Sequence, residues 1–94
     1  MSRADLLLRL AALKPWLAVQ GVTRLRLFGS HARDEALADS DVDLIADLDR
    51  PLGLRFFLLQ DELSARLGLR VDLVTEAALA ADIRHTALKD AVDA

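Results

Sequence analysis

The stretch that most constrains the fold of this chain runs from residue 28 to residue 44 and reads FGSHARDEALADSDVDL. Gly29 and Ser30 are followed, after ten residues, by Asp41 and Asp43, and apolar residues alternate with polar ones on both sides. This alternation predicts two β-strands separated by a Gly-Ser turn. The chain should therefore bring a turn that can hold a phosphate next to a pair of carboxylates.

Helix-like and strand-like segments alternate along the whole chain. Apolar residues at helical spacing predict helices at 4–20, 52–67 and 77–92, the first of which should kink or divide at Pro15. Alternation predicts strands at 22–28, 42–48 and 70–75, with a short helix after the turn at 31–38. Because long helical connections separate the strands, at least one neighbouring pair should be parallel or crossed over. The expected fold is α/β or α+β, a small mixed sheet of at least three strands with helices on one face.

Three aspartates should share the sheet face that points away from the helices. Asp41 and Asp43 are two residues apart on one strand, so their side chains leave the same face. Alternation in the third strand turns Asp72 to the same side. Arg26 of the first strand is expected on this open face, and Asp47, further along, is expected to be exposed to solvent.

These residue types indicate a reaction class. Three carboxylates on one face repel one another unless a cation offsets their charge, and oxygen ligands without His or Cys favour Mg²⁺ or Mn²⁺ over zinc. Gly29 lets the backbone approach a phosphate, and Ser30 adds a hydroxyl donor. Asp72 is then a further metal ligand or a general base. The residues alone predict metal-dependent transfer of a nucleotidyl or phosphoryl group.

The composition argues against several other classes of protein. The 94 residues include no Cys, which excludes disulfides and thiolate metal sites and favours a reducing, cytoplasmic setting. Charged residues recur too often for a signal peptide or a membrane-spanning helix. A net charge of −3, with both signs mixed along the chain, argues against direct nucleic-acid binding. We expect one domain over residues 1–94, because this length suffices for a single core.

The same motifs resemble those of a known family. Gly29-Ser30, ten residues, Asp41-x-Asp43 and the later Asp72 are similar to the pattern of the minimal nucleotidyltransferases of the DNA polymerase β superfamily. The runs LFGSHAR, SDVDLI, RVDLVT and IRHTALKDAVDA carry the resemblance over nearly the whole chain. It implies a nucleotidyltransferase, or polymerase β-like, fold.

The resemblance also implies a set of roles. Asp41 and Asp43 would bind two Mg²⁺ ions, Asp72 would complete the catalytic site, and Gly29 and Ser30 would hold the β- and γ-phosphates of a nucleoside triphosphate, with ATP as the expected donor. Small stand-alone members of the family are often antitoxins paired with a HEPN-domain toxin, and some place AMP on a tyrosine of that toxin. The implied activity is AMP transfer to a partner protein, with a HEPN-type toxin as the implied partner.

Three residues beside the turn have more than one interpretation. Arg33 either neutralises triphosphate charge, as a nucleotide-binding residue, or lies on a solvated helix face. Asp34 stands where family members usually have Gly, which restricts the backbone and adds negative charge close to the expected phosphates. His31 follows Ser30 directly, and we interpret it as a helix-start residue without a role rather than as a phosphate contact.

Two aromatic residues bear on the surfaces of the molecule. Trp16 is expected to pack against the core or another helix rather than to stack on a base. Phe57 lies roughly 120° around its helix from the apolar stripe, so it should not reach the same core. It indicates either an interface patch or a groove under the last helix. A homodimer is allowed by these features but not required.

A function of a different class also fits the motifs. A non-catalytic antitoxin would neutralise its partner by contact and keep only a vestigial nucleotide site. Asp41 and Asp43 would then be a cap and a solvated strand end, and Asp72 an exposed residue of an amphipathic strand. Transfer to a small molecule such as an aminoglycoside is a third, less favoured alternative.

Overall fold

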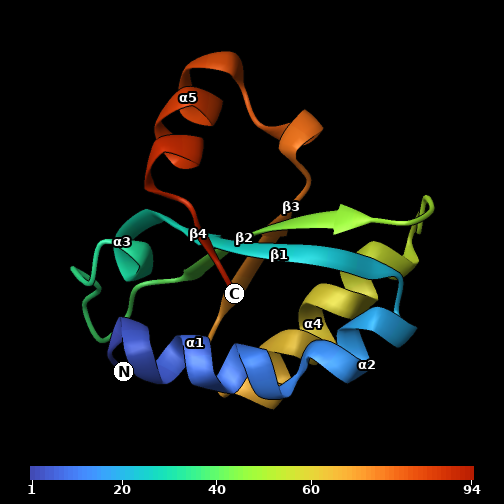
Figure 1. Cartoon of the computed structure of the whole chain (residues 1–94), viewed down its shortest axis with the longest axis horizontal. Coiled ribbons are helices and arrows are strands. Elements are labelled where there is room, and N and C mark those ends of the chain that lie inside the picture. The colour runs from blue at the N-terminus through green and yellow to red at the C-terminus, as the bar shows by residue number, and fades with distance from the viewer.

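The computed structural model describes all 94 residues as a four-stranded sheet with helices packed on it (Figure 1). The helices are α1 (Arg3–Ala12), α2 (Lys14–Val19), α3 (Gly29–Ala32), α4 (Arg55–Leu67) and α5 (Ala81–Asp90), with one 3-10 turn, η1 (Glu76–Ala78). The strands are β1 (Val22–Phe28), β2 (Val42–Leu48), β3 (Val71–Val74) and β4 (Val92–Asp93). None of the helices has the length and apolar character that crossing a membrane requires.

The N-terminal helical segment is divided, as its sequence predicts. Ser2 caps the start of α1, because its Oγ accepts a backbone N–H of the first turn. The two helices meet at Leu13, and Pro15 lies in the first turn of α2, where a missing N–H breaks no helical hydrogen bond. Trp16 packs against the core with the guanidinium of Arg66 4.2 Å from its ring centre. It is a packing residue, as expected.

The sheet is mixed, as predicted. The strand order is β3-β2-β1-β4, with β2 and β3 parallel and the other two pairs antiparallel. Helix α4 provides the crossover that a parallel pair requires. In this register Asp43 of β2 lies opposite Phe28 of β1 on one side and Asp72 of β3 on the other. Strand pairing alone thus brings two of the predicted site residues side by side.

The main core lies between one face of the sheet and helices α1, α2 and α4 (Figure 1). It is built largely from leucines, among them the fully buried Leu6, Leu10, Leu27, Leu44 and Leu63. Because strand side chains alternate between faces, burying Leu44 in this core points its neighbour Asp43 to the opposite face. The leucine core therefore orients the site residues as well as stabilising the fold.

The C-terminal segment differs from its prediction. The helix expected over 77–92 is interrupted where Leu79 and Ala80 adopt extended conformations, so η1, α5 and β4 are separate elements. Helix α5 lies on the sheet face opposite α1, α2 and α4 (Figure 1). Ile45 and Ala87 are buried outside the main core cluster, so this face has a small apolar layer of its own. Strand β4 pairs with the outer edge of β1. Hydrogen bonding to this open strand edge replaces the helix that the spacing of apolar residues had predicted for the end of the chain.

Arg26 and Asp47 also differ from expectation, because the second face is partly covered. Arg26 is only 9% exposed, and its Nη2 donates to Oδ1 of Asp47 at 3.3 Å and to Oε2 of Glu76 at 3.2 Å. Asp47 is half-buried rather than free in solvent. The partner Glu76 is 50 residues from Arg26 in the chain, so no local pattern predicts the contact. These ion pairs tie η1 to the second face.

Strand β3 is an edge strand, and side chains of α4 protect its outer edge. The backbone N–H of Leu73 donates to Oε1 of Gln60 at 2.9 Å, and that of Val71 donates to Oγ of Ser64 at 3.0 Å. Both donors would otherwise be open to pairing with another strand. The two bonds hold β3 in place and with it Asp72, which lies between Val71 and Leu73.

Helix α4 also exposes an apolar surface. Leu54, Phe57 and Leu58 have 82%, 63% and 67% of their surface exposed. The prediction that Phe57 does not reach the core is confirmed. Its ring makes an edge-on contact with Phe56, with 6.5 Å between ring centres, and both residues line a cavity that α4 shares with β3 and η1.

Gln60→Ala should lower the free energy of unfolding by about 1–3 kcal/mol, because the partly buried N–H of Leu73 loses its acceptor. Gln60→Glu keeps an acceptor at this position, and Asp61→Ala removes an exposed side chain from the same helix. Both controls should have much smaller effects. Urea denaturation followed by circular dichroism measures the difference, and equal losses for Gln60→Ala and Asp61→Ala would contradict the edge protection.

Candidate active site

The three predicted aspartates lie at one end of the parallel pair β2 and β3. Asp43 is half-buried in β2, directly opposite the exposed Asp72 of β3. Asp41 comes immediately before β2, and its Oδ1 lies 3.5 Å from Nε of the exposed Arg70. Strand pairing thus places Asp43 and Asp72 side by side, whereas Asp41, predicted on the same strand as Asp43, lies just outside β2.

The Gly-Ser turn lies directly against Asp43. Helix α3 begins at Gly29, two residues earlier than predicted, and ends at Ala32 instead of continuing to residue 38. Gly29 has φ +74°, and a Cβ added to it would lie 3.2 Å from Cγ of Asp43 and would overlap Oδ2. Glycine is therefore required both by the backbone conformation and by the close approach of the carboxylate.

The carboxyl group of Asp43 has a raised pKa. Burial of the group is the largest cause, followed by the negative charges of Asp72 and Asp41, while His31 and Arg33 act in the opposite direction. The carboxylates of Asp72 and Asp41 are therefore close enough to act on Asp43 electrostatically. A desolvated carboxylate with like-charged neighbours is typical of a functional site that binds a cation.

The chemistry of these groups fits Mg²⁺. All the candidate ligand atoms are carboxylate oxygens, and a divalent cation would offset both the burial and the repulsion that raise the pKa of Asp43. No group of three or more His, Cys, Asp or Glu side chains is placed so that it could hold a metal ion. Mg²⁺ commonly binds one or two carboxylates and completes its shell with water and substrate phosphates. The open arrangement fits a metal that binds together with a nucleotide.

His31 is a residue of this region whose contact the sequence did not reveal. Its side chain is buried, with 5% of its surface exposed, and its Nδ1 lies 3.0 Å from the backbone oxygen of Asp41. The hydrogen bond joins the Gly-Ser turn to the first of the three aspartates. The only signal in the sequence was that His31 follows Ser30, which does not show a contact ten residues away.

The two charged residues after the turn already have partners in the protein. The guanidinium of Arg33 lies 3.0 Å from Oδ2 of Asp90 and 3.2 Å from Oε2 of Glu35, and these hydrogen bonds raise its pKa. Asp34 has φ +58°, and its Oδ1 accepts the backbone N–H of Arg3 at 3.0 Å. The left-handed backbone explains why glycine suits this position. The carboxylate of Asp34 binds the start of α1.

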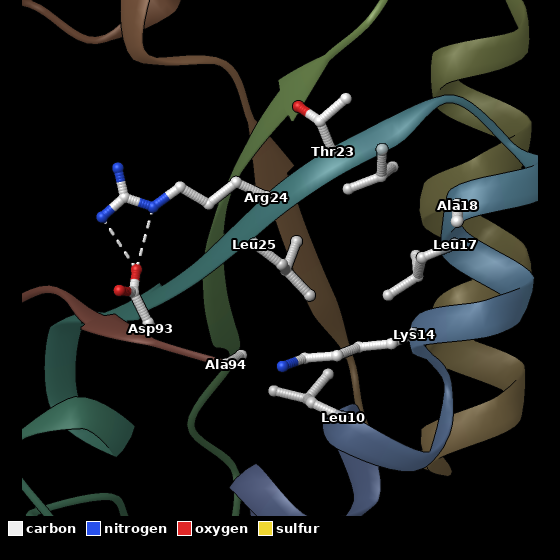
Figure 2. A pocket seen from close by; sticks show the side chains of 10 residues that line it. Leu10, Lys14, Leu17, Ala18, Thr23, Arg24, Leu25, Asp93 and Ala94 are labelled. Atoms are coloured by element: carbon white, nitrogen blue, oxygen red, sulfur yellow. Dashed lines mark hydrogen bonds and ion pairs between the residues drawn. The ribbon is translucent and has the colours of Figure 1, made fainter.

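Two cavities border β1. An open depression of about 400 Å³ lies between α5 and the turn and is lined by Phe28 and Gly29 among others. A cavity of about 380 Å³ lies beside the outer edge of β1, where Lys14 and the ion pair of Arg24 with Asp93 line it (Figure 2). None of the predicted site residues lines this second cavity. Of the predicted site residues, Gly29 lines the depression beside the turn, and Asp72 lines the cavity that α4 shares with β3 and η1.

Gly29→Ala should destabilise the protein more than Gly68→Ala. Gly68 has nearly the same backbone conformation, φ +69° against +74°, but an added Cβ there meets no atom within 4 Å. Gly68→Ala should therefore cost about 1–2 kcal/mol of left-handed strain, whereas Gly29→Ala adds the overlap with Asp43. Urea denaturation of both variants measures the excess, and equal losses would show that Asp43 does not press against the turn.

Asp43→Asn should raise the midpoint of thermal unfolding at pH 7 in the absence of metal. The raised pKa in the folded state means that protonation of Asp43 favours folding. This contribution is present below the ordinary pKa of 3.8 and is lost as the pH rises through the raised value. The amide of Asn is neutral at every pH and avoids this loss of stability. The increase in the unfolding midpoint of Asp43→Asn over the wild type should therefore shrink as the pH falls toward 4. Asp39→Asn, in an exposed loop, is the control and should not show this pH-dependent gain.

Comparison with known proteins identifies relatives of this chain. Residues 8–94 match the nucleotidyltransferase domain family. The protein adenylyltransferase MntA of Thermococcus cleftensis is 45% identical over 73 residues, which cover 77% of this chain and 74% of that protein. A solved structure assigned as a minimal nucleotidyltransferase is 39% identical, with a TM-score of 0.80 over 98% of this chain and 95% of that one. A toxin–antitoxin crystal structure with AMP-PNP shares the fold, at 18% identity and a TM-score of 0.69 over 99% of this chain and 72% of that one.

Proposed function

The chain belongs to the nucleotidyltransferase domain family, as a minimal nucleotidyltransferase of the DNA polymerase β superfamily, and on this basis we propose that it transfers AMP from ATP to a partner protein. The relative that is 45% identical is a protein adenylyltransferase, which supports both the donor and the class of acceptor. Mg²⁺ is the proposed cofactor. The proposed setting is the cytoplasm, which suits a chain that has no Cys.

The observation that carries this proposal is the contact between Gly29 and Asp43. A nucleotidyl transfer needs a group that binds phosphates within reach of a group that binds the metal. Here the turn approaches the carboxylate of Asp43 so closely that only a residue without a Cβ fits at position 29. Strand pairing adds Asp72 on the other side of Asp43, so the parts of such a site are contiguous.

Each residue has a role in the proposed reaction. A hydroxyl oxygen of the acceptor attacks the α-phosphorus of ATP, the bond to the β-phosphate breaks, and diphosphate leaves. Gly29 and Ser30 hold the β- and γ-phosphates through backbone N–H groups and the Ser30 hydroxyl. Asp41 and Asp43 bind Mg²⁺, which when bound neutralises charge on the phosphates. Asp72 completes the metal site and accepts the proton of the acceptor hydroxyl.

Arg33 is proposed to contribute positive charge near the leaving diphosphate. Its Nε and Nη1 are held by Glu35 and Asp90, which leaves Nη2 free for a phosphate oxygen. The ion pair with Glu35 is largely exposed, and exposed ion pairs contribute little in water. A triphosphate, with its larger charge, can therefore compete for the guanidinium.

The proposed acceptor is a toxin protein for which this chain is the antitoxin. A toxin–antitoxin structure with AMP-PNP shares the fold, and the resemblance of the motifs implies a HEPN-type toxin. Asp72 is exposed at the edge strand of the sheet. A hydroxyl group on the surface of another protein can therefore approach the proposed base without entering a closed pocket.

The competing function is neutralisation by contact alone. The sequence feature that weakened the case for catalysis was Asp34 in place of the usual Gly. In the structure Asp34 adopts the left-handed conformation that glycine would adopt, and its carboxylate binds the backbone N–H of Arg3. The backbone accommodates the substitution and the carboxylate has a hydrogen-bond partner, so Asp34 by itself does not count against the proposed catalysis.

Asp41→Asn and Asp43→Asn should each reduce AMP transfer at least about 100-fold while leaving the complex with the toxin intact, because both carboxylates are proposed metal ligands. Asp39→Asn, in the exposed loop just before them, is the matched control and should transfer AMP like the wild type. Labelled ATP, Mg²⁺ and the protein encoded next to this chain provide the assay. Mass spectrometry should locate a single added AMP on the partner.

Protection of cells from the toxin separates the two functions. Under the proposed function the two Asn variants fail to protect although they still bind the toxin. If both variants protect as well as the wild type, neutralisation by contact is the better account and the enzymatic proposal fails.

A further inference from the structure

His31 makes a hydrogen bond that the proposed reaction does not yet use. The residue belongs to α3, which packs against β2 (Figure 1), and only 5% of its surface is exposed. Its Nδ1 lies 3.0 Å from the backbone oxygen of Asp41. Because a carbonyl oxygen can only accept, Nδ1 must carry the hydrogen and donate it. The neutral ring therefore has its proton on Nδ1.

The backbone position of Asp41 depends on this hydrogen bond more than that of Asp43 does. Asp43 lies inside β2, where pairing with β1 and β3 fixes its backbone. Asp41 lies outside the strand, at the end of an irregular segment that starts after α3. The next N–H, of Val42, bonds to Arg70, and the carbonyl of Asp41 bonds to His31. These two bonds fix the peptide plane that follows the Cα of Asp41.

The side chain of Asp41 receives little support of its own. Its only ion pair is with Arg70 at 3.5 Å, and the side chain of Arg70 is 82% exposed. An ion pair of this kind is weak and easily rearranged in water. The position of the carboxylate therefore follows from the position of the backbone that carries it.

We propose that His31 is a positioning residue for the metal site: its Nδ1–H holds the backbone of Asp41 so that this carboxylate and that of Asp43 can bind the same cation. The inference rests on the proposed function, in which both aspartates bind Mg²⁺. It also connects the phosphate turn to the metal ligands through one side chain, because His31 directly follows Ser30. Residues that orient metal ligands typically affect metal affinity by about 10- to 100-fold.

Two substitutions of similar size separate this role from simple packing. In His31→Asn the side-chain nitrogen can occupy the place of Nδ1 and donate to the same carbonyl. In His31→Gln the amide extends toward the place of Nε2, so the bond to Asp41 is lost. A residue that only fills space would be replaced better by Gln, which has the larger side chain.

Mn²⁺, a paramagnetic substitute for Mg²⁺, is the probe. Binding of Mn²⁺ with a non-hydrolysable ATP analogue is measured by electron paramagnetic resonance in the wild type, His31→Asn, His31→Gln and Asp41→Asn. We expect His31→Asn to bind within about threefold of the wild type and His31→Gln to bind about tenfold more weakly. Equal affinity of His31→Gln and the wild type would overturn the role of His31.

The Asp41→Asn variant keeps this test separate from that of the proposed function. If the wild type does not bind Mn²⁺, or if Asp41→Asn binds it equally well, the metal site itself is wrong and the role of His31 fails with it. If Asp41→Asn loses binding while His31→Gln does not, only the role of His31 fails.

A measurement on the wild-type chain covers the case in which the variants do not fold. The chain has two histidines, His31 and His85, so ¹⁵N nuclear magnetic resonance can assign each ring by comparison with His85→Gln. We expect His31 to be in the form with the proton on Nδ1 and Nε2 unprotonated at pH 8. A proton on Nε2 alone would rule out the bond to Asp41 and with it the proposal.

Discussion

The half-buried carboxylate of Asp43 is the constraint around which the structure is arranged. Asp72 lies opposite it on the parallel strand, Gly29 touches it from the turn, and Asp41 is two residues away. Burial and the charges of Asp72 and Asp41 raise its pKa, so without a cation the ionised group opposes folding at neutral pH. The leucine core on the opposite face compensates for this destabilisation, since each fully buried leucine contributes about 1.5–3 kcal/mol to the free energy of folding. A bound cation would reverse this unfavourable contribution, which suits the proposed metal-dependent transfer.

The second face of the sheet is a bounded surface rather than an open one. Arg26 pairs with Asp47 and Glu76 and thereby holds η1, while α5 lies over the same face and borders the depression beside the turn. A nucleotide held at Gly29 would therefore have protein on one side and solvent on the other. The exposed edge at Asp72 is the side from which an acceptor can approach.

Side chains that bond to backbone groups hold the irregular segment between α3 and β2 at both ends. Asp34 binds the first N–H of α1 and stabilises the left-handed turn at its beginning. His31 binds the carbonyl of Asp41 at its end. Local hydrogen bonds of this kind replace the strand ladder where the chain has no regular structure. The geometry of the proposed metal site thus depends on residues that would not themselves touch the metal.

The amino-acid sequence by itself determined the parts that depend on local periodicity and local sterics. Alternation predicted β1, β2 and β3, and with them the neighbouring positions of Asp43 and Asp72, and Pro15 predicted the division of the first helix. Only the tertiary structure decided the side on which α5 packs, the pairing of β4, and the burial of Arg26 and His31. The physical reason is distance along the chain. These contacts join residues 10 to 69 positions apart, and their free energy depends on neighbours that no local pattern specifies.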